Sequence, residues 1–250
     1  MTTASFLIAG VQKAGTTALH SYLSEHPSLF LPKQKELHFF DQSADWKNPI
    51  YRTYNQFFEA ARPDQLAGEA TPIYTYWVPS AKRIHAYNPR MKLIISLRDP
   101  VRRAFSHWEM ETSRGMERLS FSEAIREGRS RFVSKDPGSV CAHRVFSYVE
   151  RGFYGEQVAR LMKYFPREQL FFLKKASLRK ELHPLMDRLC HFLQIPKFQS
   201  YPVPRTSEPV KKKKNLGKIN AEDSRYLHNL YQPDIEKTEK LTGLDLSNWK

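Results

Sequence analysis

A pattern typical of a strand, a turn and a helix lies near the start of the chain and reads Phe6-Leu-Ile-Ala-Gly10-Val-Gln-Lys13-Ala-Gly15-Thr16-Thr17. Its apolar run is typical of a buried strand, and the glycine-bounded turn after it leads into a helix starting near Thr16. Such a turn presents backbone N–H groups and a helix N-terminus to an anion. The stretch therefore predicts a phosphate-binding loop, and the alternative is an ordinary strand-turn-helix corner with a solvated Lys13.

The lysine of this loop is displaced relative to the loop of ATP- and GTP-hydrolysing proteins. Those proteins have Lys directly after the second glycine, whereas this chain has Thr16 there and Lys13 three residues earlier. The displaced form resembles the 5′-phosphosulfate loop of sulfotransferases that use 3′-phosphoadenosine 5′-phosphosulfate (PAPS). The resemblance implies that the cofactor-binding residues here are Lys13, Ala14, Gly15, Thr16 and Thr17, with Lys13 also catalytic.

A second phosphate-binding motif follows the apolar run of residues 91–97. Pro100 suits the first turn of a helix, and Asp99 can cap that helix. In the same sulfotransferases, an arginine and a serine eight residues later hold the 3′-phosphate of the cofactor, and Arg98 and Ser106 have this spacing. A guanidinium group binds phosphate through two hydrogen bonds, and a hydroxyl two helical turns further on adds another.

A third segment resembles one branch of that family. The sequence Glu36-Leu-His38-Phe-Phe-Asp41 is similar to a stretch of the Golgi heparan sulfate sulfotransferases and their bacterial relatives. Residues 68–74 and 151–154 resemble later segments of the same branch, and the likeness runs from about residue 6 to residue 198. Two departures stand out: Ala70 replaces a lysine of the heparan sulfate enzymes, and their cysteine-bounded loop near the C-terminus is missing.

The acceptor of a transferred group needs a general base, which contributes about 10²–10⁴-fold to a rate. The resemblance favours Glu36 as this base, with His38 and Asp41 supporting it. Because Glu36 and His38 are two residues apart, we expect them on the same side of an extended segment, where one of them takes the proton and the other orients it. Glu69 is the competing base, since some heparan sulfate enzymes use the glutamate of that later segment. Outside catalysis, Glu36 would pair with a neighbouring lysine, and His38 would pack beside Phe39 and Phe40.

Strand and helix patterns alternate along the chain and predict a P-loop-like, three-layer α/β/α fold with a central parallel sheet, as one domain over residues 1–250. We expect strands at 6–9, 66–70, 91–97 and 169–173. Expected helices cover 16–25, 51–61, 79–87, 101–112, 121–127, 142–151, 156–164, 178–193 and 220–242, the last packing on the outside. The very basic segment 201–218 is either a solvated loop or a lid over the cofactor.

Composition limits the partners. The net charge of +14 over 250 residues favours an anionic partner. Only two cysteines argue against a disulfide scaffold. We see no signal peptide and no transmembrane run, so we expect a soluble, cytoplasmic protein without stable membrane insertion. No acidic residue ends the strand of residues 93–97 to position magnesium, and the nine histidines form no ligand-like cluster, so we predict no catalytic metal.

Three classes of function follow from these patterns. The first is a PAPS-dependent sulfotransferase that moves a sulfuryl group to a hydroxyl or amine of a small natural product or glycan. A P-loop-type small-molecule or nucleoside kinase is second, and the missing lysine at Thr16 counts against it. A nucleic-acid-binding module is third, but leaves Lys13, Arg98 and Ser106 unexplained. Aromatic residues that either wall an acceptor pocket or belong to the core are Trp46, Tyr51, Tyr74, Tyr76, Trp77 and Trp108.

Overall fold

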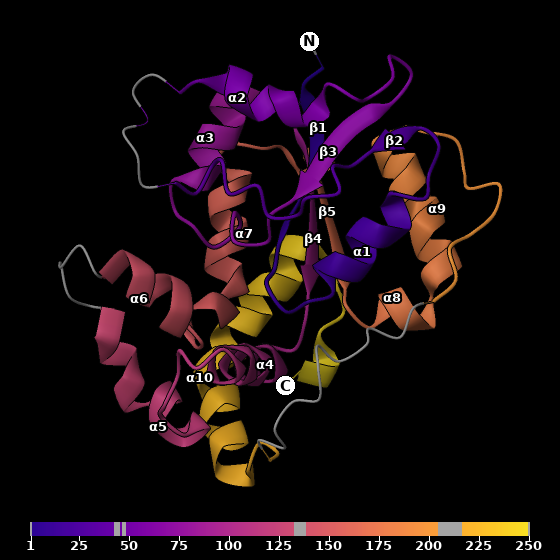
Figure 1. Cartoon of the computed structure of the whole chain (residues 1–250). Helices are drawn as coiled ribbons and strands as arrows, with labels where there is room; N and C mark the ends of the chain where they lie inside the picture. Colours follow the sequence, from indigo (N-terminus) through magenta and orange to yellow (C-terminus); the bar gives the residue numbers. More distant parts are fainter. Residues whose placement is uncertain (1, 43–45, 47–48, 133–138, 205–216, 250) are drawn as a thin grey trace. The chain divides into compact units, whose positions relative to one another are not determined.

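The computed structural model describes residues 2–42, 46, 49–132, 139–204 and 217–249 (Figure 1). Contacts divide the chain into two compact units. The first unit comprises Met1–Leu97 with Gln157–Thr206 and contains the sheet. The second comprises Arg98–Glu156 with Ser207–Lys250 and is helical in its described part.

The sheet of the first unit is entirely parallel, with strand order β2-β3-β1-β4-β5. Its strands are β1 (Ala4–Gly10), β2 (Leu29–Phe30), β3 (Leu66–Ala70), β4 (Lys92–Leu97) and β5 (Leu170–Lys174). In the central strand β1, Leu7 pairs with Glu69 of β3 and Leu93 of β4. Residues 6–9 are fully buried, as expected for a strand that is covered on both faces.

Helices cover both faces of this sheet. Figure 1 shows α1 (Thr16–Leu23), α8 (Ser177–Lys180) and α9 (Leu182–Leu193) on one face, and α3 (Ser80–Tyr87) and α7 (Tyr154–Met162) on the other. On the first face, Phe6 and Ile8 of β1 form a core with the leucines of α1 and α9. The helix α2 (Tyr51–Asn55) continues as a 3₁₀ turn, Gln56–Phe58. The predicted three-layer α/β/α architecture with a parallel sheet is therefore confirmed.

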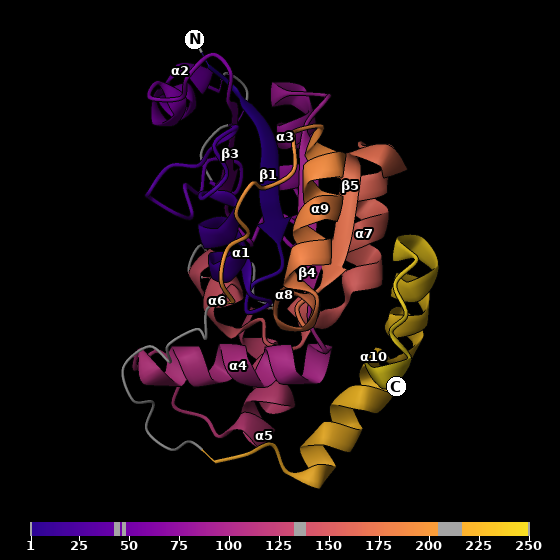
Figure 2. The same ribbon diagram turned by 90° about the vertical axis from the view of Figure 1, so that its right-hand side faces the viewer.

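The second unit is built around α4 (Pro100–Ser113), which packs on α5 (Phe121–Ile125) and α10 (Ala221–Thr242) (Figure 2). The unit also contains α6 (Ser139–Phe146), and short 3₁₀ turns cover Glu127–Phe132, Glu150–Gly152 and Ser247–Trp249. Gly243 ends α10 in the left-handed conformation that is typical of helix C-termini.

Several predicted elements differ from the structure. The short strand β2 was not predicted, because two residues are too few for a periodic pattern. The helix expected at 142–151 ends at Phe146, since the next residues, including the fully buried Tyr148, turn into the core. The helix expected at 178–193 is broken at Glu181, where φ is −139°. Of the basic segment 201–218, predicted to be either a solvated loop or a lid, residues 205–216 lie outside the described part of the chain.

The last helix, predicted to pack on the outside, buries one face in the second unit and exposes residues of the other. Three apolar residues of α10 are buried in the second unit, namely Leu227, Tyr231 and Ile235. Tyr231 donates a hydrogen bond of 2.8 Å to the carbonyl of Val149. Gly152 leaves room for this ring, since a Cβ atom there would lie 2.6 Å from three of its atoms. The helix is therefore part of the core of its unit.

Candidate active site

The predicted site residues follow the carboxyl ends of the parallel strands. Lys13 follows β1, Glu36 lies in the segment after β2, and Glu69 lies near the end of β3. Arg98 is the residue after β4 and begins the second unit. Parallel α/β sheets bind ligands at the carboxyl ends of their strands, at the switch point. This is the place where the connections from two neighbouring strands lead to opposite sides of the sheet. Because β1 has β3 on one side and β4 on the other, the loop after β1 occupies that switch point.

The loop after β1 is held in the shape of an anion cradle. Gly15 precedes α1 with a φ of +86°, and α1 has no side-chain cap and no acidic residue in its first turn. The amide of Val11 donates to the carbonyl of Ser96 at 2.8 Å, and Ser96 Oγ donates to the carbonyl of Ala14 at 2.7 Å. The first amides of a helix have no acceptor within the helix. This geometry suits the phosphate-binding loop that the sequence predicts, and anion binding by the loop stays a prediction.

The three residues predicted to be catalytic share an unusual backbone conformation. Lys13, Glu36 and His38 have φ values of +72°, +58° and +54°, and in the described part of the chain only Gln194 joins them among non-glycine residues. A left-handed non-glycine residue costs about 1–3 kcal/mol and persists only where the surrounding structure holds it. Such strain is concentrated at functional sites, so this observation supports the choice of these residues.

Glu36, His38 and Asp41 form one chain of polar contacts. His38 Nδ1 lies 2.9 Å from Asp41 Oδ2, and His38 Nε2 lies 3.6 Å from Glu36 Oε2. The expected extended segment was wrong, since both Glu36 and His38 are left-handed, but this bend still brings the two side chains together. The hydrogen bonds of His38 to Asp41 and then to Glu36 raise the pKa of His38 to about 9.

This pKa separates the roles of the two candidate bases. At neutral pH an imidazole with a pKa of about 9 is protonated, so His38 cannot accept a proton from an acceptor. Asp41 is fully buried, whereas the side chain of Glu36 is 47% exposed. The geometry therefore favours Glu36 as the proton acceptor, with His38 as the cation that orients it.

The end of β3 supports the segment that carries these residues. The amide of Glu36 donates to the carbonyl of Ala70 at 2.9 Å, and the amide of Phe39 donates to the hydroxyl of Tyr74 at 3.1 Å. The amide of His38 donates a longer bond, 3.5 Å, to Thr71 Oγ1. These contacts hold the left-handed backbone in place from outside the segment.

Glu69 lies beneath this segment and is completely buried. Thr71 Oγ1 donates to its carboxylate at 2.7 Å, and the hydroxyl of Tyr54 donates to it at 3.2 Å. Burial raises the pKa of Glu69 to about 7, although the hydrogen bonds from Thr71, Tyr74 and Tyr54 lower it. A carboxyl group enclosed in this way supports Thr71 and the segment above it, which makes Glu69 the weaker candidate for the base.

Two lysines near the cradle were not assigned to it from the sequence. Lys35 Nζ donates a hydrogen bond of 2.7 Å to Thr17 Oγ1. Lys175 lies against Gly15, since a Cβ atom on Gly15 would be 3.4 Å from Lys175 Cγ. The only sequence signal for Lys175 is its position directly after the apolar strand β5.

The second phosphate motif forms the start of α4 in the second unit. Pro100 is the first residue of the helix, and Asp99 caps it by accepting a hydrogen bond of 2.8 Å from the amide of Arg102, as predicted. The hydroxyl of Tyr154 donates to the carbonyl of Arg98 at 2.8 Å. Arg98 and Ser106 are both half-buried, and burial lowers the pKa of Arg98. A bound phosphate would offset that cost of burial.

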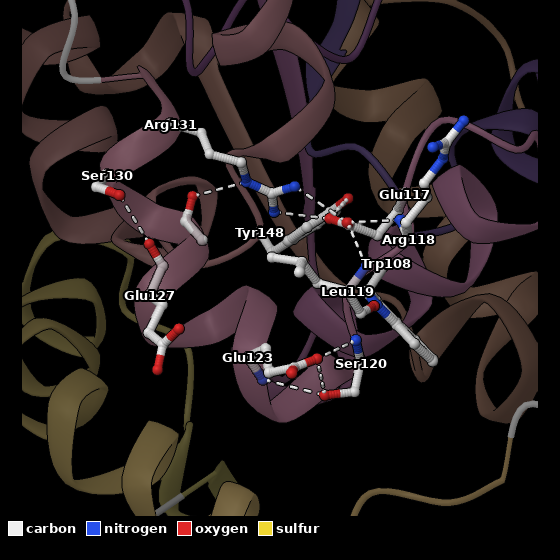
Figure 3. A network of polar contacts seen from close by, with 11 residues as sticks. Trp108, Glu117, Arg118, Leu119, Ser120, Glu123, Glu127, Ser130, Arg131 and Tyr148 are labelled. Atoms are coloured by element: carbon white, nitrogen blue, oxygen red, sulfur yellow. Dashed lines mark hydrogen bonds and ion pairs between the residues drawn. The ribbon is translucent and has the colours of Figure 1, made fainter.

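A buried carboxylate fixes the turn after α4 (Figure 3). Glu117 is 4% exposed and accepts hydrogen bonds from the amides of Arg118 and Leu119, both at 2.8 Å. It also accepts bonds from Arg131, at 2.7 and 3.0 Å, and from the hydroxyl of Tyr148, at 2.9 Å. The network therefore joins the end of α4 to the chain on both sides of α5.

Two of the predicted pocket aromatics belong to the core. Trp108 is 6% exposed, donates to the carbonyl of Leu119 at 2.9 Å and packs against Phe121. Tyr74 is 1% exposed, and its hydroxyl accepts a hydrogen bond from the amide of Phe39. The others are half-buried, namely Trp46, Tyr51, Tyr76 and Trp77. Trp108 and Tyr74 are buried because each packs among aromatic side chains of its own unit.

Two kinds of feature are not found among the described residues. No three His, Cys, Asp or Glu side chains in that part of the chain gather as metal ligands. Within the same ranges, no helix is both long enough and apolar enough to cross a bilayer.

Comparison with known proteins gives consistent matches. Residues 4–240 match the family described as sulfotransferase domain. Heparan sulfate glucosamine 3-O-sulfotransferase 5 of Mus musculus is 30% identical over 190 residues, covering 76% of this chain and 53% of the relative. Heparan sulfate glucosamine 3-O-sulfotransferase 3B1 of Homo sapiens is 27% identical over 258 residues, covering 96% and 63%. The crystal structure of a sulfotransferase from Alicyclobacillus acidocaldarius has a TM-score of 0.83 and 26% identity, covering 100% of this chain and 99% of that one.

The chain spans only about half the length of the first of these curated relatives, whereas it covers nearly all of the bacterial structure. The matched domain includes residues of both compact units, and its extent to residues 1–250 stays a prediction. The fold likeness confirms the P-loop-like α/β prediction, and the family match confirms the predicted family. The chain belongs to the sulfotransferase domain family.

Proposed function

We propose that this chain transfers the sulfuryl group of PAPS to a hydroxyl group, or to an amine, of a glycan or a small natural product. The observation that carries the proposal is the cradle with its displaced Lys13, in the same unit as the contact chain of Glu36, His38 and Asp41. A phosphate cradle alone fits many nucleotide enzymes, but a carboxylate oriented by a charged imidazole adds the base that a hydroxyl acceptor requires.

The assignment of the donor to residues follows the two motifs. The 5′-phosphosulfate would be held by the loop from Lys13 to Thr17. The 3′-phosphate would be held by Arg98 and Ser106, whose guanidinium and hydroxyl groups suit a dianion. No metal ion is needed in this scheme, because Lys13 supplies the positive charge, and the absence of a metal stays a prediction.

The chemistry is an in-line displacement at sulfur. Glu36 takes the proton of the acceptor hydroxyl. At the same time the oxygen of that hydroxyl bonds to sulfur, and the bond between sulfur and the phosphate oxygen breaks. Lys13 neutralises the negative charge that develops on that leaving oxygen, and 3′,5′-adenosine bisphosphate is released. By analogy with phosphoryl transfer, the protein contributes mainly positioning and charge stabilisation.

The acceptor class is supported by the relatives. The two curated relatives bear the name of heparan sulfate, which favours a glycan. Ala70 stands where heparan sulfate enzymes have a lysine, and this favours a different glycan or a small molecule. The relatives named as 3-O-sulfotransferases favour a hydroxyl over an amine. The cytoplasmic location and the absence of a nucleic-acid partner stay predictions.

Thermal melting with 3′,5′-adenosine bisphosphate, compared with AMP and ATP, tests the proposal. At about 100 times its Kd, a ligand stabilises the fold by about 2.7 kcal/mol, or about 5–10 °C for a chain of this size. We expect this shift with the bisphosphate and its loss in Arg98→Ala. A shift with ATP and none with the bisphosphate would overturn the proposal and favour a kinase.

A further inference from the structure

Lys35 brings a second cationic side chain to the phosphate cradle from outside the loop. Its Nζ donates a hydrogen bond of 2.7 Å to Thr17 Oγ1, in the first turn of α1. The two residues are 18 positions apart, so this contact depends on how the segment after β2 packs beside the loop after β1. The segment is held there by the bond from the amide of Glu36 to the carbonyl of Ala70.

The surroundings of Lys35 favour an anionic ligand. Its side chain is 19% exposed, and Nζ lies 4.0 Å from Glu36 Oε1, which is the outer limit of an ion pair. Burial lowers the pKa of Lys35, although the charges of Glu36 and Glu69 raise it. An ammonium group in such a place is costly unless an anion offsets its desolvation. The open N-terminus of α1, with no acidic residue in its first turn, attracts the same anion.

We propose that Lys35 binds the 5′-phosphosulfate end of the donor, as a second lysine beside Lys13. The inference rests on the proposed function, because it takes PAPS as the ligand of the cradle. Lys35 lies between Thr17 of the cradle and the candidate base Glu36. From there its ammonium group reaches the part of the donor that faces the acceptor, and it shares the neutralisation of the transferred group.

The test compares Lys35→Ala and Lys35→Arg with Lys33→Ala. Lys33 is exposed and lies in the same segment, so its variant controls for the loss of one positive charge. Binding of 3′,5′-adenosine bisphosphate and of adenosine 3′-phosphate is measured by calorimetry for each variant. The second ligand lacks the 5′-phosphate, and a melting curve of each variant shows that it is folded.

We expect Lys35→Ala to bind the bisphosphate about tenfold to a hundredfold more weakly. It should bind adenosine 3′-phosphate like the wild type, Lys35→Arg should keep most of the affinity, and Lys33→Ala should change neither ligand. Equal behaviour of Lys35→Ala and Lys33→Ala would overturn the inference, and so would an equal loss for both ligands. If wild-type protein bound neither ligand, the proposed function would fail and this inference with it.

Discussion

At the scale of single residues, the candidate active site combines side chains of opposite charge whose backbones have positive φ values. Lys13, Glu36 and His38 are all left-handed, and contacts from β3 hold the last two. Asp41 at 2.9 Å and Glu36 at 3.6 Å raise the pKa of His38 to about 9, which favours its cationic form and leaves the exposed carboxylate of Glu36 as the more suitable base.

Glu36→Gln should lower kcat by about 10²–10⁴-fold, because the amide cannot accept the acceptor's proton. Affinity for 3′,5′-adenosine bisphosphate should stay near the wild-type value. The rate is measured as release of the bisphosphate from PAPS with the best acceptor from a glycan and small-molecule panel. Glu59→Gln, at an exposed position of the same unit, is the matched control. A wild-type kcat in the Glu36→Gln protein would show that Glu36 is not the general base and would favour Glu69 instead.

His38 should make stability depend on pH. Its pKa is raised from 6.5 to about 9 in the folded protein, so folding favours the protonated form. This contribution is fully present below about pH 6.5 and is lost as the pH rises through 9. Urea unfolding of the wild type and of His38→Gln between pH 6 and 10 measures it. The difference between the two should shrink over that range, and a constant difference would show that His38 is not held as a cation.

At the scale of elements, Glu117 is one of several buried carboxylates in the described part of the helical unit. Glu117 fixes the turn after α4 and joins it to Arg131 and Tyr148 (Figure 3). Burial alone would raise the pKa of Glu117, but the hydrogen bonds from Arg131, Leu119 and Tyr148 outweigh burial and lower it. Because Ser106 is on α4, the position of a proposed phosphate ligand depends on this network.

Glu117→Gln should reduce the free energy of unfolding by about 1–3 kcal/mol, since Arg131 loses its charged partner. Glu127→Gln is the same change at an exposed position and should stay within about 0.5 kcal/mol of the wild type. Denaturant melts at pH 7 provide both values. Because the pKa of Glu117 is lowered in the folded protein, the stability that its carboxylate contributes is lost as the pH falls. The difference in free energy of unfolding between the wild type and Glu117→Gln should therefore become smaller in acid. Equal melts of the two variants at pH 7 would exclude a supporting role for this network.

At the scale of the whole molecule, the net charge of +14 is a general attraction for anions. We expect it to produce only weak binding to nucleic acid. Any affinity for duplex DNA at 50 mM salt should fall by about 10³–10⁵-fold at 200 mM if six to ten phosphates are contacted. Fluorescence anisotropy with two unrelated duplexes checks this. Tight, sequence-dependent binding at 200 mM salt would instead favour a nucleic-acid function.

The parallel α/β fold and the cap of α4 could be predicted from the sequence alone, and the resemblance of its motifs predicted the family, while the phosphate-binding role of the loop after β1 stays a prediction. The fold and the cap depend on periodicity and on neighbours within a few residues, which a single sequence displays. Three features are visible only in the folded chain: Glu69 is buried, Glu36 and His38 meet through a bend, and Lys35 reaches Thr17. These outcomes depend on strand order and on contacts between distant segments, because the loops after different strands converge only once the sheet is assembled.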